Sequence, residues 1–252
     1  MQAYGPAFAR IYQQRWSGFA QQAAPQIFDF YTRTDVGKVN RAVLDLACGT
    51  GHLARALLDR GCRVTGLDLS AAMLDYAREN TEAYIDSGQA RFEQVDITRF
   101  AMADAFGLVV STYDALNHLA DFEALQSCFR SVYPLLVDDG WFIFDLNTRL
   151  GLQRWNNVSV EESDDAIIIT RGVYDGRGDR AWMRLSGCLR VAGGKYERFE
   201  ETAFNSVYDL AEVQRALLEI GWASVHCARI TDLSTPLDEP EREGRVFVVA
   251  RK

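Results

Sequence analysis

Three aspartates in the first half of the chain lie at or near the ends of apolar runs that have the composition of buried strands. They are Asp45, Asp68 and Asp96. When strands alternate with helices they form a parallel sheet, and ligands bind at its carboxyl edge. Carboxylates crowded at that edge repel one another, and a bound cation relieves the repulsion. The three acids therefore predict a site for a positively charged ligand.

The first of these acids precedes a glycine turn. Residues 42–53 read as a strand buried on both faces, a turn through Gly49 and Gly51, and the start of a helix. Glycines let the backbone approach a ligand closely, and the free amides that open the helix point at it. Asp45 lies where a dinucleotide pyrophosphate would lie in the dehydrogenase version of this turn, and its carboxylate repels phosphate and attracts ammonium. The turn therefore favours a cationic adenosine ligand without phosphates, namely S-adenosylmethionine.

The same turn resembles motif I of the class I S-adenosylmethionine-dependent methyltransferases, in the stretch Asp45-Leu46-Ala47-Cys48-Gly49-Thr50-Gly51. The resemblance continues through about residues 4–145. It implies an α/β fold with a seven-stranded Rossmann-like sheet, mostly parallel, whose last strand is antiparallel. It also implies S-adenosylmethionine as the cofactor.

Cofactor contacts are predicted along the whole carboxyl edge. Asp68 lies about 20 residues beyond the glycines, where an acid can accept both ribose hydroxyls of an adenosine. Met73 on the next helix is either core filler or a cover for the adenine. The resemblance implies that Asp96 accepts the adenine amino group and that the amide of Ile97 reaches the ring. The predicted cofactor-binding residues are Tyr12, Trp16, Asp45, Ala47, Gly49, Gly51, Asp68, Leu69, Met73, Asp96, Ile97 and Ser111.

Aromatic residues recur at every fourth position near the N-terminus, which places Tyr4, Phe8, Tyr12 and Trp16 on one stripe of a helix. Such a stripe ordinarily docks a helix on the core, and this is our interpretation for Phe8. The other three carry a polar group that needs a partner when buried. Small-molecule methyltransferases that this segment resembles close an N-terminal helical lid over the cofactor. We therefore expect residues 1–33 to form a lid.

A polar and aromatic loop follows the fourth predicted strand, at residues 112–119, where the family holds its methyl acceptor. The predicted acceptor-binding residues are Tyr4, Tyr113, Asn117 and His118. His118 can titrate beside a reacting centre, although it can equally well hydrogen-bond the helix that begins at Asp121. The predicted catalytic groups are Tyr4, Tyr12 and His118, and no metal site is predicted.

Ser70, Asp121 and Asp209 are each predicted to cap a helix. After the fifth strand the pattern of elements changes. Three extended segments, at residues 166–174, 180–191 and 196–208, are separated by glycine turns without helices between them. We expect an antiparallel insertion at 149–205 that covers the substrate site, forms a homodimer contact, or both. The methyltransferase core is then formed by residues 34–148 and 206–252.

The composition limits which partners and which cellular compartment we expect. The 252 residues carry a net charge of -8, which disfavours nucleic acid as a substrate. The five cysteines are odd in number and form no C-x-x-C pair, which indicates a reducing compartment. No apolar stretch is long enough to span a bilayer, and the N-terminus has no leader pattern. We expect a cytoplasmic protein that binds no membrane.

Methyl transfer from a sulfonium needs mainly an oriented, uncharged nucleophile and the exclusion of water. The lid tyrosines, the loop with Asn117 and His118, and the insertion resemble amino-sugar and antibiotic-tailoring N-methyltransferases. The Asn/Asp-Pro-Pro-Tyr signature of DNA-amino and protein-glutamine methylation is absent. We therefore expect a methyltransferase that acts on a small polar molecule, at nitrogen. The alternatives are O-methylation, a nicotinamide oxidoreductase, which Asp45 disfavours, and a non-catalytic cofactor-binding protein.

Overall fold

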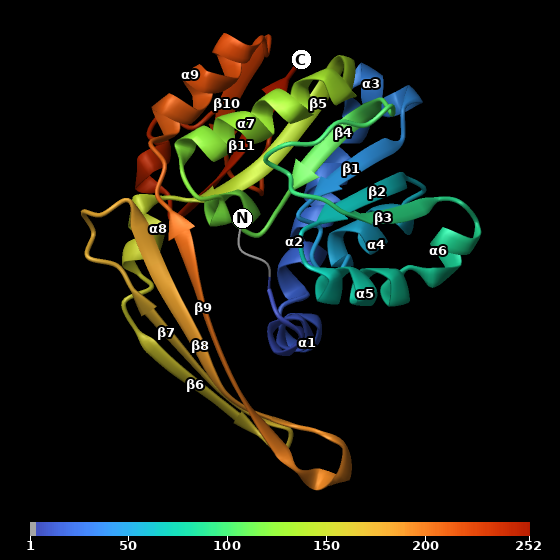
Figure 1. Ribbon diagram of the computed structural model, residues 1–252. Coiled ribbons are helices and arrows are strands. Elements are labelled where there is room, and N and C mark those ends of the chain that lie inside the picture. The colour runs from blue at the N-terminus through green and yellow to red at the C-terminus, as the bar shows by residue number, and fades with distance from the viewer. Residues whose placement is uncertain (1–3) are drawn as a thin grey trace.

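A computed structural model describes residues 4–252 and shows two sheets (Figure 1). The main sheet has seven strands in the order β10-β11-β5-β4-β1-β2-β3. Its strands are β1 (Ala42–Leu46), β2 (Arg63–Asp68), β3 (Ala90–Gln94), β4 (Phe106–Ser111), β5 (Leu136–Asn147), β10 (Ser224–Ala228) and β11 (Arg245–Arg251). Strands β1 to β5 are parallel to their neighbours among themselves, and β11 is antiparallel to both β5 and β10. The predicted fold class is confirmed.

Helices cover both faces of this sheet. The α-helices of the described residues are α1 (Pro6–Arg15), α2 (Gly18–Arg33), α3 (Asp35–Val39), α4 (His52–Leu58), α5 (Ala71–Asn80), α6 (Glu82–Asp86), α7 (Phe122–Val132), α8 (Arg149–Gln153) and α9 (Leu210–Ile220). Helices α7 and α9 pack on one face, and α2, α4 and α5 pack on the other. No helix in residues 4–252 is long and apolar enough to cross a membrane.

Side chains of the central strands alternate between these two layers. In β5, Phe142 and Phe144 join the cluster under α7 and α9, whereas Ile143 joins the cluster under α2 and α4. Since successive residues of a strand point to opposite faces, a strand with two buried faces is apolar throughout. This is the reason that the sequence shows continuous apolar runs there.

The helices begin at the residues that the sequence predicts. Ser70 accepts a hydrogen bond from the amide of Met73, and Asp121 accepts one from that of Ala124. Asp209 does the same at the start of α9. Each cap satisfies an amide that has no partner inside its helix. The cap at Ser70 matters most for the site, because α5 begins directly after Asp68.

The insertion has four antiparallel strands, one more than the sequence predicts. They are β6 (Val158–Ser163), β7 (Ala166–Val173), β8 (Arg180–Arg190) and β9 (Tyr196–Ser206). Every residue of β6 is exposed, so this edge strand lacks the apolar alternation by which the other three are recognised. The short helix α8 was not predicted either. Figure 1 shows the insertion curving away from the main sheet, with α1 on its inner side.

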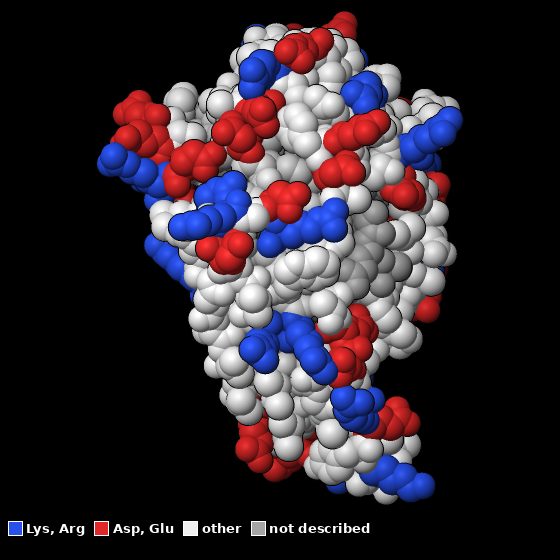
Figure 2. Space-filling model, turned by 60° about the vertical axis from the view of Figure 1, so that its left-hand side comes forward, with Lys and Arg blue, Asp and Glu red and all other residues white. Residues whose placement is uncertain are grey.

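The two faces of the insertion differ. On the inner face, Ile168, Leu185 and Phe199 pack in one cluster with Phe8 and Ile11 of α1. On the outer side, large apolar side chains are exposed at Val158, Val160, Ile167, Ile169, Val173 and Trp182. The predicted homodimer contact would lie there; the dimer and the cytoplasmic location remain predictions. Over the face drawn in Figure 2, acidic and basic side chains are interspersed without a continuous basic surface.

The predicted lid, residues 1–33, divides into two parts in the structure. Residues 1–3 lie outside the described residues. Helix α2 buries Ala23, Ala24 and Ile27 in the core beside α4. Of residues 4–33, those that line the cavity described below lie between Tyr4 and Trp16, so we restrict the proposed lid to that segment.

Two adjacent leucines of α9 test this account of the core. Leu217 is fully buried, whereas Leu218 is 50% exposed. Leu217→Ala leaves a cavity and should lower the free energy of unfolding by about 2–5 kcal/mol. Leu218→Ala is the matched control and should change it by no more than about 0.5 kcal/mol. Urea denaturation of the two variants measures both values, and equal losses would contradict the assigned burial.

Candidate active site

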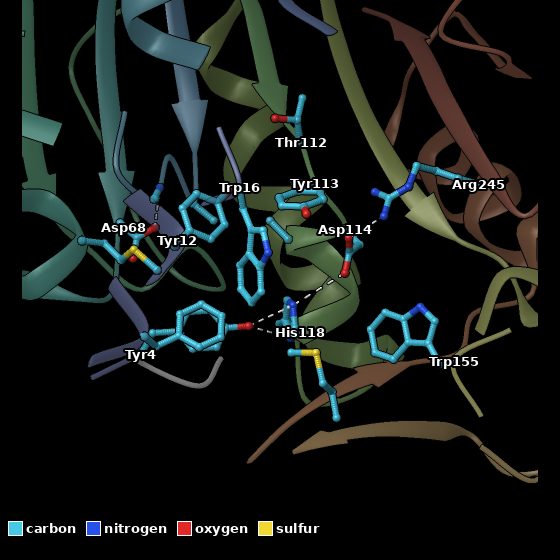
Figure 3. A pocket seen from close by; sticks show the side chains of 16 residues that line it. Tyr4, Tyr12, Trp16, Asp68, Thr112, Tyr113, Asp114, His118, Trp155 and Arg245 are labelled. Atoms are coloured by element: carbon cyan, nitrogen blue, oxygen red, sulfur yellow. Dashed lines mark hydrogen bonds and ion pairs between the residues drawn. The ribbon is translucent and has the colours of Figure 1, made fainter. Parts of the chain in front are cut away.

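A cavity of about 260 Å³ lies between α1, the carboxyl edge of the main sheet and the insertion (Figure 3). The aromatic stripe of residues 4–16 forms one wall. The turn after β1 and the loop after β4 form the floor, and the insertion contributes Met183. The lining residues are Tyr4, Phe8, Tyr12, Trp16, Ala47, Gly49, Asp68, Met73, Thr112, Tyr113, Asp114, Ala115, His118, Trp155, Met183 and Arg245.

The glycine turn forms one end of this cavity. Gly49 and Gly51 have φ angles of +54° and +76°, which residues other than glycine rarely adopt. A Cβ on Gly51 would lie 2.9 Å from the Cβ of Ala77, so the turn packs directly on α5. A Cβ on Gly49 would lie 3.6 Å from the Tyr12 ring. The Tyr12 phenol therefore closes over the turn, as expected for a lid residue.

Two buried carboxyls lie beneath the turn. Asp68 accepts hydrogen bonds from the amides of Gly49 and Ser70, at 2.9 and 2.8 Å. Burial raises the pKa of Asp68. Asp45 is 2% exposed, and no described residue hydrogen-bonds its Oδ2. Burial, and then the neighbouring Asp68, raise the pKa of Asp45 to about 8.

Most of the predicted cofactor residues lie together. Tyr12, Trp16, Ala47, Gly49, Asp68 and Met73 line the cavity. Asp45 lines a side pocket of about 20 Å³ with Tyr12 and Ala47. Gly51 completes the turn, and Leu69 is half-buried directly after Asp68.

The other three predicted cofactor residues line neither the cavity nor the side pocket. Asp96 is exposed, and its carboxylate accepts a hydrogen bond from the amide of Thr98. Ile97 is buried in the core. The Ser111 hydroxyl donates to the carbonyl of Leu46 and thereby ties β4 to β1. Their roles toward the cofactor remain predictions.

The other end of the cavity holds the predicted catalytic pair. Tyr4 Oη lies 3.0 Å from His118 Nε2 and 3.2 Å from Nδ1. Asp114 Oδ2 is 3.7 Å from His118 Nε2. Burial lowers the pKa of His118 and raises that of Tyr4, so the imidazole and the phenol are both neutral near pH 7. A neutral imidazole in a cavity can accept a proton from a ligand.

Two further loop residues have different places. Tyr113 lines the cavity and stacks on Phe19, with ring centroids 4.8 Å apart. Asn117 does not line it. Its amide group bonds the backbone of Asn147 and the carbonyl of Ser206, so it holds the loop against β5 and β9. We therefore reassign Asn117 from acceptor binding to positioning of the loop.

The sequence analysis missed an ion cluster beside His118. Arg245, at the start of β11, donates to Asp114 Oδ1 at 2.7 Å and also bonds Asp145. Trp155 and Met183 of the second half of the chain also line the cavity. Asp114 lay within the loop already singled out, but no motif marks Arg245, which is 131 residues away. The pairing of Arg245 with Asn147 across β11 and β5 brings it there.

The sheet order, the glycine turn and the acids beneath it define a class I methyltransferase core. Residues 43–140 match the family described as "Methyltransferase domain". Over 239 residues the chain is 29% identical to a protein assigned as a methyltransferase in Geobacillus sp. (strain WCH70), with 94% of this chain and 92% of that protein covered. The chain therefore has a methyltransferase domain, and it resembles S-adenosylmethionine-dependent methyltransferases over nearly its whole length.

Solved structures share the fold over nearly the whole chain. An S-adenosylmethionine-dependent methyltransferase from Clostridium acetobutylicum ATCC 824 matches with a TM-score of 0.80 and 22% identity, and 97% of each chain is covered. The sugar N-methyltransferase KedS8 from Streptoalloteichus sp ATCC 53650 matches with a TM-score of 0.74 and 20% identity, and 100% of this chain and 97% of that one are covered. The insertion is therefore part of the shared architecture.

The residues at the turn fit this cofactor. Asp45 has a buried oxygen without a partner, and Asp68 lies beside it, so the end of the cavity at the turn favours positive charge. Gly49 has no side chain, so a ligand can approach the backbone of the turn at the floor of the cavity. The residues that would hold the cofactor are Tyr12, Gly49 and Asp68 at the cavity and Asp45 beneath it.

Cofactor binding should release protons. With a pKa of about 8, Asp45 is mostly protonated at pH 7, and a nearby cation favours its ionised form. Binding of S-adenosylmethionine at pH 7 should therefore release about one proton, and affinity should rise with pH up to about 8. Calorimetry in buffers of different ionisation enthalpy measures the release.

The variant Asp45→Asn should release no proton. Asp75→Asn is the control, because the Asp75 side chain is 72% exposed on α5. A wild-type protein that binds the cofactor at pH 7 without releasing a proton would show that Asp45 is already ionised.

Proposed function

We propose that this methyltransferase transfers a methyl group to a nitrogen atom of a small polar molecule that binds beside His118. The observation that carries the proposal is the position of the His118 imidazole, which lines the cavity and lies 3.0 Å from the Tyr4 hydroxyl. An amine is protonated near pH 7 and must lose a proton before it can act as a nucleophile. A buried neutral imidazole is suited to accept that proton.

The remaining residues hold the ligands in position and exclude water from the cavity. S-adenosylmethionine, when bound, supplies an electrophilic methyl group on a sulfonium. Tyr12 and Trp16 cover the cavity and exclude water, while Asp68 and the turn fix the position of the cofactor end. Tyr4 orients the imidazole. Orientation and exclusion of water account for most of the rate that such a displacement requires.

A labelled-methyl assay tests the proposal. The protein is incubated with methyl-labelled S-adenosylmethionine and a panel of small amines, alcohols, phenols and carboxylic acids. Mass spectrometry then locates the label. We expect labelled amines; label only on oxygen would contradict the assignment to nitrogen, and no labelled product from any class would contradict the small-molecule acceptor.

His118→Gln tests the proton acceptor. With the best amine of that panel, kcat/KM should fall about 100-fold, because glutamine cannot take a proton. The Kd for S-adenosylhomocysteine should stay within about twofold, since His118 lies away from the turn. His226→Gln is the matched control, because His226 bonds the carbonyl of Leu233 in the β10 region. Equal activities of the two variants would rule out His118 as the base.

A further inference from the structure

Two carboxylates share one guanidinium at the acceptor end of the cavity. Arg245 binds Asp114 through Nη2 and Asp145 through Nη1. The backbone amide of Asp114 also donates to Asp145 Oδ2, at 3.0 Å. Burial raises the pKa of Asp145, and Arg245 opposes that rise. When both acids are ionised, the cluster of three side chains keeps one negative charge in excess, and Arg245 has no charge left to attract an anion.

The backbone holds the Asp114 carboxylate in one orientation. Tyr113 and Asp114 have φ angles of 65° and 50°, which are uncommon for residues other than glycine. The Arg245 guanidinium lies over the rings of Phe19 and Tyr113, 4.9 and 5.6 Å from their centroids. This packing and the ion pair fix the loop, so Asp114 Oδ1 is occupied by Arg245.

The second oxygen of Asp114 is turned toward the cavity. Oδ2 lies 3.7 Å from His118 Nε2, a distance that leaves it short of a hydrogen bond (Figure 3). Asp114 is only 7% exposed, so this oxygen has little access to bulk water. Trp16 and Trp155 also line this part of the cavity, and aromatic faces attract cations.

The other acids of the site face elsewhere. Both oxygens of Asp68 accept backbone amides at the glycine turn. Asp45 lines the side pocket behind the turn. Among the described residues that line the main cavity, Asp114 is thus the carboxylate at the acceptor end.

We infer that Asp114 recognises the methyl acceptor by binding its ammonium group through Oδ2, and that Arg245 and Asp145 hold Asp114 in place for this purpose. The inference rests on the proposed function and adds a specificity residue to it. An ammonium bound there lies next to His118, which then receives the proton. Acceptors that carry a carboxylate or a phosphate at this position are disfavoured by the excess negative charge.

Binding without turnover tests this inference. The full-length protein, saturated with S-adenosylhomocysteine, is titrated with cyclohexylamine, cyclohexanol and cyclohexanecarboxylate, which share one ring. Tryptophan fluorescence reports on the cavity through Trp16 and Trp155. We expect cyclohexylamine to bind at least about tenfold more tightly than the other two, because charge-assisted hydrogen bonds are the strong ones.

The variant Asp114→Asn tests whether ligand binding depends on the charge of the carboxylate, because it leaves the shape of the site nearly unchanged. Asparagine tolerates the left-handed backbone and keeps one oxygen for Arg245. Cyclohexylamine should bind the variant about 10- to 100-fold more weakly, whereas S-adenosylhomocysteine should bind within about twofold of wild type. Asp139→Asn is the matched control, since Asp139 is exposed and has a φ of 59°.

Two results would overturn the inference. One is cyclohexylamine binding the wild-type protein no better than the alcohol and the carboxylate, including no binding by any of the three. This comparison needs no variant and so stands even if Asp114→Asn fails to fold. The other is equal affinity in Asp114→Asn and Asp139→Asn. Neither result bears on methyl transfer to a neutral or anionic acceptor, which the labelled-methyl assay measures separately.

Discussion

The burial of four carboxyl groups at one edge of the main sheet is the constraint on which the site depends. Asp45, Asp68, Asp114 and Asp145 are each less than 9% exposed, and Arg245 is the guanidinium that binds two of them. Removing a carboxylate from water is costly unless it is paired or protonated. The four acids are accommodated in three ways: Asp68 by backbone amides, Asp114 and Asp145 by Arg245, and Asp45 by a pKa raised to about 8.

This arrangement places buried acids at both ends of the cavity and compensates them in different ways. At the glycine turn, no cationic side chain of residues 4–252 pairs with the acids, so a cationic cofactor would complete the site. At the acceptor end, Arg245 neutralises one of two carboxylates and fixes the other. A site that left Arg245 unpaired would attract anions, and one that lacked it would bury two uncompensated carboxylates. The cluster thus sets both the stability of the loop and the charge that the acceptor meets.

The sequence predicted what depends on local pattern. The buried strands, the caps at Ser70, Asp121 and Asp209 and the turn at Gly49 each follow from neighbouring residues, and the structure has them. The sequence could not predict contacts that depend on how distant strands pair. Arg245 reaches Asp114 only because β11 pairs with β5, and β6 carries no buried face that could mark it as a strand. Asn117 does not line the cavity, and a polar residue in a loop does not show from the sequence whether its amide serves a ligand or the backbone.

Tyr4 links the two ends of the cavity. Its carbonyl accepts a hydrogen bond from the Ser70 hydroxyl, which also caps α5, while its phenol bonds His118. Glu201 of β9 accepts the amides of Gly5 and Phe8, at the start of α1. Tyr4 therefore joins the helix α5 to the proposed base, and Gly5 and Phe8 join the start of α1 to the insertion. If α1 moves as the proposed lid, its displacement would remove the orienting partner of His118 and admit water in the same movement, so the proposed lid would also align the proposed base.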